Sequence, residues 1–415
     1  MSEQGIRAFS VIVVSIYVAR FLGPKGFGVI SYAMALTTLF LAIARLGMES
    51  ILVREVADKK LRVNNLMGTA FWLMFAASGL AVLVLNTLVN ISETDSLLIA
   101  CIFFISLGIF FQPFFVIDYG FQGQIKAKYS SIAKTIAVSI SSLIKIGLVF
   151  CESDLIFIAI AYACDNFFVA LFLLIVHKKV QKHKFVNEFK WSFVKNLLKS
   201  AWPMVLSTLS IVLYMRVDQL MIKHLLGIEE LGVYASATRI YEGCAMIFVV
   251  FTNSLLPLIV DVKNSSKEEF TNKMILIFRL VFWVAVGLAF LITLYSKEII
   301  TITFGLDYIG SQEPLEILMW ALAFTGMGSV TARYLTAERQ EKKIAIRTFV
   351  ALAINLCLNF LLIPIYGITG AAISTLISIT IANYFIDYTD KQLKTLIYIK
   401  NNAIFLGLIG KNIRA

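Results

Sequence analysis

Charged residues are scarce in this 415-residue chain. Asp, Glu, Lys and Arg together make up 15% of it, against about 25% in an average soluble domain. Apolar residues make up 59% of the chain, and the mean hydropathy is +0.84. So few charges exclude a soluble globular protein, and the composition indicates an integral membrane protein.

Cysteine is also rare, and its five residues lie singly inside apolar runs without CxxC spacing. We interpret them as small buried side chains, not as disulfides or metal ligands. Neither HExxH nor GxSxG occurs, and GPKGFG at residues 23–28 lacks the GK[ST] ending of a phosphate-binding loop. We therefore expect no enzyme, no metal site and no cofactor. The cysteines are Cys101, Cys151, Cys164, Cys244 and Cys357.

Long apolar runs fill most of the sequence. A helix needs about 20 residues to cross a bilayer, and these runs lack the alternation of barrel strands, so they predict helices. The first run has no cleavage site of small residues, so no cleavable signal peptide is expected. Twelve spans are predicted near residues 6–22, 29–46, 66–90, 97–117, 130–151, 155–176, 200–226, 232–258, 274–295, 313–333, 345–365 and 369–389.

Basic residues cluster in alternate connections between these spans. Residues 54–62, 178–195 and 339–343 are rich in Lys and Arg, whereas the connections facing the other way hold almost none beyond Lys25 and Lys297. The positive-inside rule places the basic loops and both termini in the cytoplasm. The net charge of +11 is therefore interpreted as a topology signal, and no nucleic-acid partner is expected.

A short motif occurs twice, 204 residues apart. LGPKGFGVISYA at residues 22–33 aligns with LGIEELGVYASA at residues 226–237. The match indicates two halves of six spans, related by an axis along the membrane normal, as in secondary transporters; chance coincidence of common apolar letters is the alternative. The predicted segments are an N-terminal bundle at 1–180, a basic cytoplasmic linker at 181–199, a C-terminal bundle at 200–390 and a cytoplasmic tail at 391–415.

The region between the halves, residues 177–203, is rich in lysine. Phe185, Phe189, Phe193 and Leu197 recur every four residues within it. This spacing is typical of a basic amphipathic helix at the inner leaflet. A solvated linker that carries topology charges explains the composition equally well.

Ionisable residues inside spans are costly and mark candidate functional sites. Lys134 and Lys145 lie eleven residues apart, so they share nearly one helix face, which we expect to point to the protein interior. Lys134 is near enough to the cytoplasmic end to extend to the surface instead, whereas Lys145 lies too deep for that. Three serines lie on or beside the same face: Ser131, Ser141 and Ser142.

Further charges lie in the spans of the second half. Arg216 and Asp218 are two positions apart and cannot easily pair with each other, so each needs a partner on another helix or a watery cavity. An ion pair between helices is the alternative for them. Arg239 and Glu242 are three residues apart, which favours a local ion pair. Asp165, Arg20, Arg45 and Arg333 complete the set, and the three arginines lie near span ends, where each can extend to the surface.

Several segments resemble the Wzx-type polysaccharide flippases of the multidrug/oligosaccharidyl-lipid/polysaccharide exporter superfamily. The resemblance rests on motifs spread along most of the chain. They are ARFLGPKGFGVISYA (19–33), LGMESILVREVA (46–57), LLKSAWP (197–203), RVDQLMI (216–222), LGIEELGVYASATRI (226–240) and IPIYGITGAAISTLIS (363–378). One departure is that only residues 1–5 precede the first span, where the family has a longer amphipathic lead.

The resemblance implies an all-α membrane protein with two six-helix bundles in a V-shaped arrangement, like multidrug exporters of the superfamily. The implied cargo is an oligosaccharide on undecaprenyl diphosphate, moved by alternating access from the cytoplasmic to the periplasmic leaflet of the bacterial inner membrane for O-antigen and lipopolysaccharide synthesis. Membrane lipids, a polysaccharide polymerase and a chain-length regulator are the implied partners.

A cationic site between the halves near mid-membrane is expected to hold the diphosphate, because Arg and Lys bind phosphate. The candidates are Lys145, Arg216, Arg239, Arg20, Arg45, Lys134 and Arg333, while Asn355 and Asn359 are expected to face sugars. A proton or sodium gradient is expected to drive transport, with Asp218, Asp165 and Glu242 as candidate coupling residues.

Two rival functions are weighed against this one. A drug or cation exporter of the same superfamily needs an acidic cavity, and the excess of cations over acids in the spans argues against it. A membrane glycan polymerase or glycosyltransferase needs a sizeable outer loop. The longest outward connection, residues 296–312, is too short for that.

Overall fold

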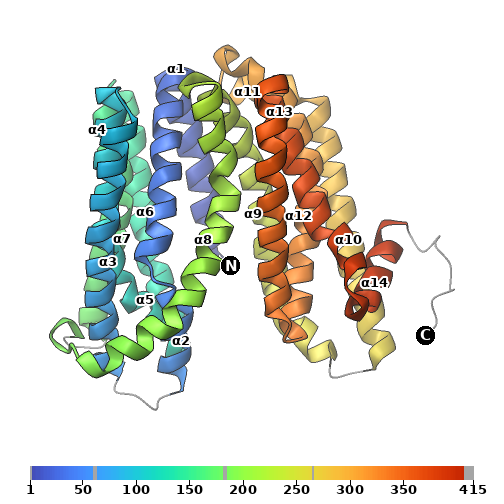
Figure 1. Ribbon diagram of the computed structural model, residues 1–415, viewed down its shortest axis with the longest axis horizontal. Helices are drawn as coiled ribbons and strands as arrows, with labels where there is room; N and C mark the ends of the chain where they lie inside the picture. The colour runs from blue at the N-terminus through green and yellow to red at the C-terminus, as the bar shows by residue number, and fades with distance from the viewer. Residues whose placement is uncertain (1, 59–62, 181–184, 264–265, 406–415) are drawn as a thin grey trace. The chain divides into compact units, whose positions relative to one another are not determined.

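The computed structural model describes residues 2–58, 63–180, 185–263 and 266–405, and every regular element in these ranges is helical (Figure 1). Ten helical segments within them are long and apolar enough to cross a membrane. Two of these, Ser10–Ala57 and Glu341–Thr389, contain a glycine whose backbone is not helical. If each of these two segments is divided at Gly23 or Gly367, the ten segments become twelve helical segments. The prediction of an all-α protein with many spans is confirmed.

Glycines with positive φ make both breaks. In α1 (Ser2–Ala44) Gly23 has φ 68° and ψ 177°, and in α13 (Glu341–Asn383) Gly367 has φ 60° and ψ −141°. Only glycine adopts such angles at little cost. Pro24 follows Gly23 directly, and proline suits the first turn of a helix because its missing N–H would have no partner there. The connection expected between the spans 6–22 and 29–46 is therefore wrong in extent, since a single non-helical residue, Gly23, separates the two helical parts.

The second copy of the repeated motif contains the same backbone feature. Gly227 lies between α8 (Trp191–Leu225) and α9 (Ile228–Lys263), and its φ is 107°. It aligns with Gly23 in the repeat, so both copies end one helix and start the next at a glycine with positive φ. This agreement supports the interpretation of the repeat as structural.

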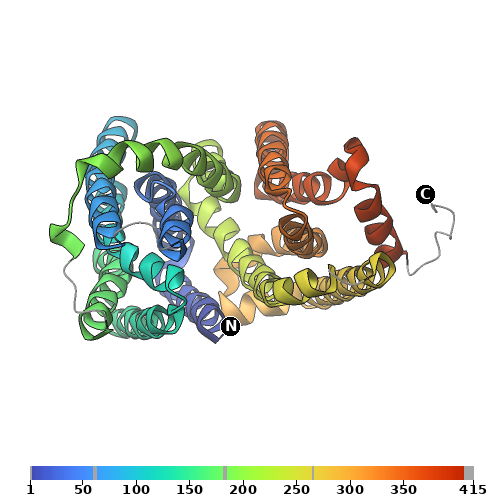
Figure 2. The ribbon, with the colours of Figure 1, turned by 90° about the horizontal axis from the view of Figure 1, so that it is seen from below.

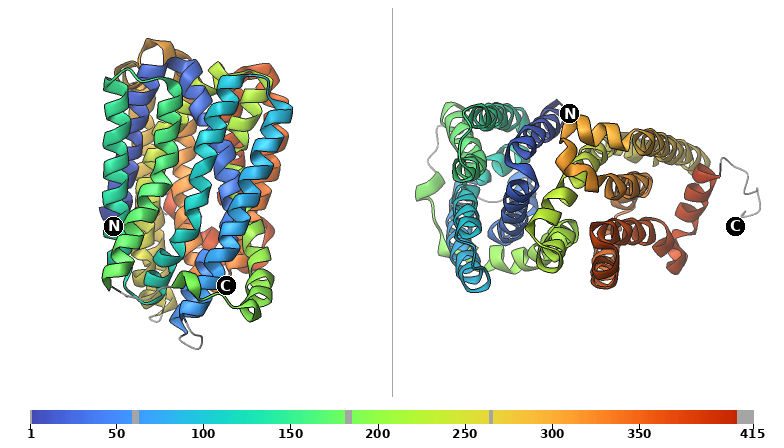
Figure 3. Two further views of the ribbon diagram at one scale, coloured as in Figure 1. Left: turned by 90° about the vertical axis from the view of Figure 1, so that its left-hand side faces the viewer. Right: turned by 90° about the horizontal axis from the view of Figure 1, so that it is seen from above.

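The chain divides into two compact units within α8, between Arg216 and Val217. The N-terminal unit is Phe9–Arg216, and in it α6 packs along α7 (Figure 3) while α2 packs on α5. Its core includes the buried side chains of Leu52, Phe71 and Leu173. Beyond α1 and the first part of α8, its helices are α2 (Met48–Ala57), α3 (Val63–Ser92), α4 (Ser96–Ser106), η1 (Leu107–Phe115), α5 (Val116–Gly123), α6 (Ala127–Phe150), α7 (Leu155–Val180) and η2 (Phe185–Asn187).

In the C-terminal unit α12 packs against α9, α10 and α13 and is therefore central. A methyl group on Gly326 of α12 would lie 2.7 Å from Val281 of α10, so glycine permits this close approach. The unit begins with the end of α8 and α9, and continues with α10 (Lys267–Leu294), α11 (Ser296–Thr303), η3 (Leu306–Ser311), α12 (Gln312–Ala337), α13, η4 (Phe385–Thr389), η5 (Lys391–Leu393) and α14 (Lys394–Ile404).

The segment expected to be a C-terminal tail contains the helix α14, which packs on α10. Leu396, Ile399 and Ala403 are buried there. Trp283 of α10 donates from Nε1 to the carbonyl oxygen of Ala403 at 3.3 Å. The remainder of the expected tail, residues 406–415, lies outside the described residues. The limits of the four predicted segments stay predictions.

The cysteines differ from expectation in one respect. All five are free, but Cys151 and Cys357 are exposed, so the prediction that they are buried is wrong for these two. Their surroundings are apolar in sequence because the outward faces of spanning helices are apolar as well as the inward ones. Apolar neighbours in the chain therefore do not establish burial in a membrane protein.

Candidate functional site

One cluster of charged residues lies in the N-terminal unit between α6 and α7. Lys145 is 5% exposed, and its Nζ atom lies 2.6 Å from each carboxylate oxygen of Asp165. The hydroxyl of Ser141 also donates to Asp165, and the ring centroid of Tyr162 lies 4.1 Å from the lysine Nζ atom. The inward orientation expected for Lys145 is observed. Its charge, however, is balanced by a partner that the sequence did not indicate.

Exposure differs across this ion pair. The side chain of Asp165 is 41% exposed, whereas that of Lys145 is 7% exposed. The lysine is thus enclosed by protein, while its counter-ion faces a more open surface. Of the two partners, Asp165 is therefore the one more open to its surroundings.

Lys134, the second lysine of the predicted stripe, is also paired. Its Nζ atom lies 3.1 Å from Oδ2 of Asp118 on α5, and both side chains are largely buried. The structure therefore does not show Lys134 extended to the cytoplasmic surface. Asp118 was missed because it directly follows the predicted span 97–117. A helix continued through that residue would have placed a second acid in the bundle.

A second polar cluster lies in the C-terminal unit around Asp218 of α8, which is 9% exposed. Asn359 of α13 donates from Nδ2 to its Oδ1 at 2.6 Å, and the Tyr234 hydroxyl of α9 donates to its Oδ2 at 3.1 Å. The hydroxyl of Thr375, beyond the break in α13, also donates to Oδ2. Among the described residues no Lys, Arg or His forms an ion pair with this carboxylate. The sequence left open an ion pair between Asp218 and another helix, and the described residues do not form one.

Two asparagines extend this cluster. Asn355 and Asn359 are 1% and 0% exposed, and Nδ2 of Asn359 lies 3.1 Å from Oδ1 of Asn355. They bind one another and the groups around Asp218, and the expectation that they face sugars stays a prediction. Oδ1 of Asn359 is buried without a hydrogen-bond partner. A carboxylate, amide oxygens and the Thr375 hydroxyl together form a set of oxygen donors that suits a proton or a hard cation.

The remaining predicted residues differ in burial and in their contacts. Arg239 is 8% exposed and its Nη1 lies 3.3 Å from Oε2 of Glu242, which confirms the expected local ion pair. Arg216 is half-buried on α8, and Arg20 is exposed on α1. Arg45 and Arg333 are half-buried, and each has a buried Nε atom that forms no hydrogen bond.

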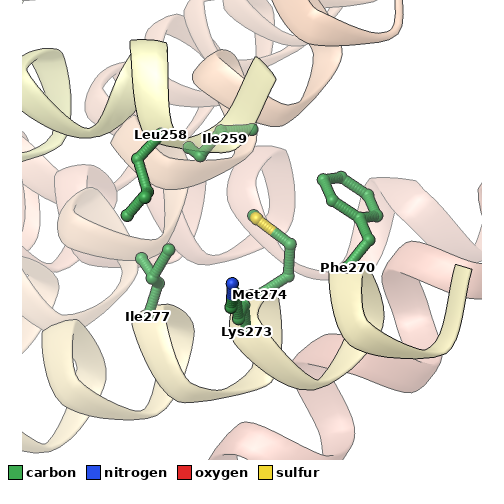
Figure 4. A pocket seen from close by; sticks show the side chains of 6 residues that line it. All are labelled: Leu258, Ile259, Phe270, Lys273, Met274 and Ile277. Atoms are coloured by element: carbon green, nitrogen blue, oxygen red, sulfur yellow. The ribbon is translucent and has the colours of Figure 1, made fainter. Parts of the chain in front are cut away.

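A pocket between α9 and α10 has a volume of about 10 Å³, room for roughly one water molecule. Figure 4 shows that its lining is apolar except for one lysine. It is too small and too apolar to hold a sugar or a diphosphate. The lining side chains are Leu258, Ile259, Phe270, Lys273, Met274 and Ile277.

Comparisons with protein families give two overlapping matches. A family described as "Polysaccharide biosynthesis protein" matches residues 2–263. A family described as "MatE" matches residues 203–361. The first match covers more than half of the chain and includes Lys145, Asp165 and Asp218.

Two relatives with assigned names are similar in sequence. A "Putative O-antigen transporter" of Shigella flexneri is 23% identical over 391 residues, which cover 86% of this chain and 88% of that protein. A "Probable low-salt glycan biosynthesis flippase Agl15" of Haloferax volcanii is 24% identical over 186 residues, which cover 43% of this chain and 38% of that protein.

Solved structures share the fold. The structure titled "Lipid II flippase MurJ, inward closed conformation" gives a TM-score of 0.73 at 16% identity and covers 97% of this chain and 89% of its own. An inward-facing multidrug resistance MATE family transporter of the MOP superfamily gives a TM-score of 0.76 at 15% identity, with coverage of 95% and 96%. At these identities the likeness establishes the fold alone.

Proposed function

The chain belongs to the polysaccharide biosynthesis protein family, whose model matches residues 2–263, and from that premise we propose that it is a flippase for lipid-linked oligosaccharides. Its cargo is an oligosaccharide repeat unit on undecaprenyl diphosphate. The protein moves this cargo by alternating access from the cytoplasmic to the periplasmic leaflet of the bacterial inner membrane, with both of its termini in the cytoplasm. A polysaccharide polymerase and a chain-length regulator act on the delivered units.

The family match carries the proposal, and the physics of the cargo supports it. A diphosphate and its sugars cannot cross about 30 Å of hydrocarbon without polar groups to replace water. The spans of this chain supply such groups in both units, at Lys145 with Asp165 and at Asp218 with Asn359. The predicted binding site between the halves stays a prediction.

Lys145 is the residue we propose to hold the diphosphate. An unpaired ammonium group in a protein interior is strongly unfavourable, so Asp165 balances its charge before the cargo binds. Because Asp165 is the more exposed partner, the incoming diphosphate displaces it and takes over the lysine. Cargo binding is thus an exchange of one anionic partner for another, and neither state leaves the lysine unpaired.

Asp218 is the residue we propose for ion coupling. Its hydrogen bonds come from neutral donors, so binding a proton or a sodium ion would neutralise a buried charge that lacks an ion-pair partner. The unpartnered Oδ1 of Asn359 is a further oxygen that a sodium ion can use. Asp165 and Glu242, which already pair with cations, are weaker candidates for this role.

A drug or cation exporter of the same superfamily is the second candidate. The observation that favours it is the match of residues 203–361 to the MatE family, a range that contains Asp218. The two candidates differ in the charge of the cargo. Resistance to cationic drugs without restored polysaccharide, in cells that lack their own flippase, supports the exporter.

The proposal is tested in a bacterium whose O-antigen flippase gene is deleted and replaced by this chain. The wild-type chain restores surface polysaccharide, and the double variant Lys145→Ala/Arg216→Ala does not, at equal abundance in the membrane. The matched control is Lys25→Ala/Lys297→Ala, which removes two exposed lysines from the loops predicted to face outward. Normal polysaccharide from the Lys145/Arg216 variant contradicts the assigned site, and failure of the wild-type chain with every glycan tested contradicts the function.

A further inference from the structure

The first three turns of α8 expose two tryptophans and two lysines on one side. Trp191 is 77% exposed and Trp202 is 66% exposed, with Leu198 at 42% between them. Lys195 and Lys199 are exposed beside them. At about 100° per residue these five positions fall within one side of the helix, which we call the tryptophan–lysine face.

A neighbouring side of these turns packs on the N-terminal unit. Val194, Leu197 and Ala201 are buried, and the last two belong to the main core cluster of that unit. Their spacing of three and four residues is that of a single helical stripe. The segment is therefore a packed amphipathic helix with a defined outer face.

The residues that lead into α8 are fixed as well. Trp72 of α3 donates from Nε1 to the carbonyl oxygen of Val186 at 2.9 Å, and the backbone N–H of Lys190 donates to Thr69 Oγ1 at 3.1 Å. The ring of Phe189, which is 41% exposed, lies 6.0 Å from that of Trp191. Of the two interpretations of residues 177–203, the amphipathic helix describes residues 191–203, while residues 181–184 lie outside the described residues.

Figures 1 and 2 show these turns at one end of the N-terminal unit, at an angle to the following part of α8. Pro203 lies within α8 directly after these turns, and its missing N–H and its ring weaken a helix at that point. Because α8 has 35 residues and about 20 are enough to cross a bilayer, its first turns can extend to the boundary between the bilayer and water.

We propose that the tryptophan–lysine face binds the headgroups of anionic phospholipids. Tryptophan prefers the boundary between acyl chains and water, where its ring is buried and its N–H stays hydrogen-bonded. Lys195 and Lys199 are the charged residues from Trp191 to Trp202, with no acid among them, so the face is complementary to an anionic surface. This binding is separate from cargo transport and does not depend on the proposed function.

The test uses the purified full-length protein in zwitterionic detergent, with the midpoint of thermal unfolding as the readout. Short-chain phosphatidylglycerol is titrated, with short-chain phosphatidylcholine and inorganic phosphate as separate arms. The expected result is saturable stabilisation by phosphatidylglycerol alone. The variant Lys195→Gln/Lys199→Gln raises the half-saturating concentration of phosphatidylglycerol about 10- to 30-fold, because two lysines that attract the anionic headgroup are lost.

Two matched variants make the result specific. Lys25→Gln/Lys297→Gln removes the same charge from other exposed positions and leaves the titration unchanged. Lys195→Arg/Lys199→Arg keeps the charge and retains the wild-type midpoint shift, which separates lipid binding from damage to the fold. Three outcomes overturn the proposal. The two glutamine variants have the same half-saturating concentration of phosphatidylglycerol, phosphatidylcholine or phosphate stabilises the wild type as much as phosphatidylglycerol does, or phosphatidylglycerol does not stabilise the wild type.

Discussion

Nδ2 of Asn359 lies 2.6 Å from Oδ1 of Asp218, although 141 residues separate them in the chain. This hydrogen bond joins α13 to α8, and Tyr234 adds α9 to the same carboxylate. A buried acid held only by neutral donors responds to a cation in its surroundings more directly than one already paired with lysine or arginine. The coupling hypothesis therefore makes its clearest prediction at this residue.

Asp218→Asn keeps the shape of the side chain and removes its charge. We expect the variant to fold and to lose at least about 90% of gradient-driven transport, because an amide cannot take up a proton or balance a sodium ion. Transport in vesicles is measured with and without an imposed proton or sodium gradient. Glu242→Gln, which removes a paired carboxylate, serves as the control and keeps its response to the gradient. A variant Asp218→Asn that still responds to either gradient contradicts the assignment.

Asp165→Asn leaves Lys145 buried without a full counter-charge. We expect a loss of about 1–3 kcal/mol in unfolding free energy, less than for a fully buried pair because Asp165 is partly exposed. The loss is measured by denaturation in detergent.

The double variant Lys145→Leu/Asp165→Leu separates stability from function. Removing both charges is expected to restore most of the stability, since no unpaired charge remains. Polysaccharide export stays lost, because the diphosphate has no lysine to bind. A stable double variant with normal export shows instead that the pair is only structural.

Gly23 and Gly227 test the structural meaning of the repeat. Replacing either with alanine forces a Cβ atom into a backbone region that costs about 1–3 kcal/mol, and we expect a matching loss of stability. Gly147→Ala is the control, because Gly147 lies within α6 with open space around its Cβ position. It is expected to be neutral or slightly stabilising. An equal loss of stability at all three positions contradicts the idea that Gly23 and Gly227 are needed for their positive φ angles.

Lys400 on α14, outside the ten spanning segments, gives a prediction for pH. Burial lowers the pKa of Lys400 from 10.5 to about 8, against the opposing effect of Asp387, whose Oδ2 lies 2.7 Å from its Nζ atom. Between these two pKa values the unfolded chain binds more protons than the folded one, so stability rises with pH across that window. Below about pH 8 both states are protonated and this contribution is constant.

Lys400→Met removes the titrating group and is expected to flatten the rise in thermal stability between pH 8 and 10.5. The measurement is the unfolding midpoint in detergent as a function of pH. Lys394→Met, at another position of α14, is the matched control and keeps the wild-type slope. The same slope in Lys400→Met and the wild type contradicts the account.

Local sequence patterns predicted much of the fold. Apolar runs separated by charges located the spans, because each span must bury its own backbone hydrogen bonds in a helix of nearly fixed length. The three-residue spacing of Arg239 and Glu242 predicted their ion pair for the same reason, since helix geometry alone brings them together.

The partners in the candidate sites could not be predicted in this way. Asp165 meets Lys145 across two helices, and Asn359 meets Asp218 across 141 residues. Such contacts depend on how each helix is rotated about its axis, which a single helical pattern in apolar sequence leaves open. Lys145 was expected to face inward and is buried, whereas the sequence allowed Lys134 to extend to the cytoplasmic surface. The neutralisation of both lysines by Asp118 and Asp165 depends on side chains from other helices.

The most direct test of the central claim is a leaflet-accessibility assay with the purified protein in sealed vesicles. A fluorescent oligosaccharide on undecaprenyl diphosphate is placed in both leaflets, and a membrane-impermeant reductant destroys the label that reaches the outside. The account predicts that label from the inner leaflet becomes accessible with the wild-type chain and stays protected with Lys145→Ala/Arg216→Ala. Protection of the inner label in wild-type vesicles, at the level of protein-free vesicles, would contradict it.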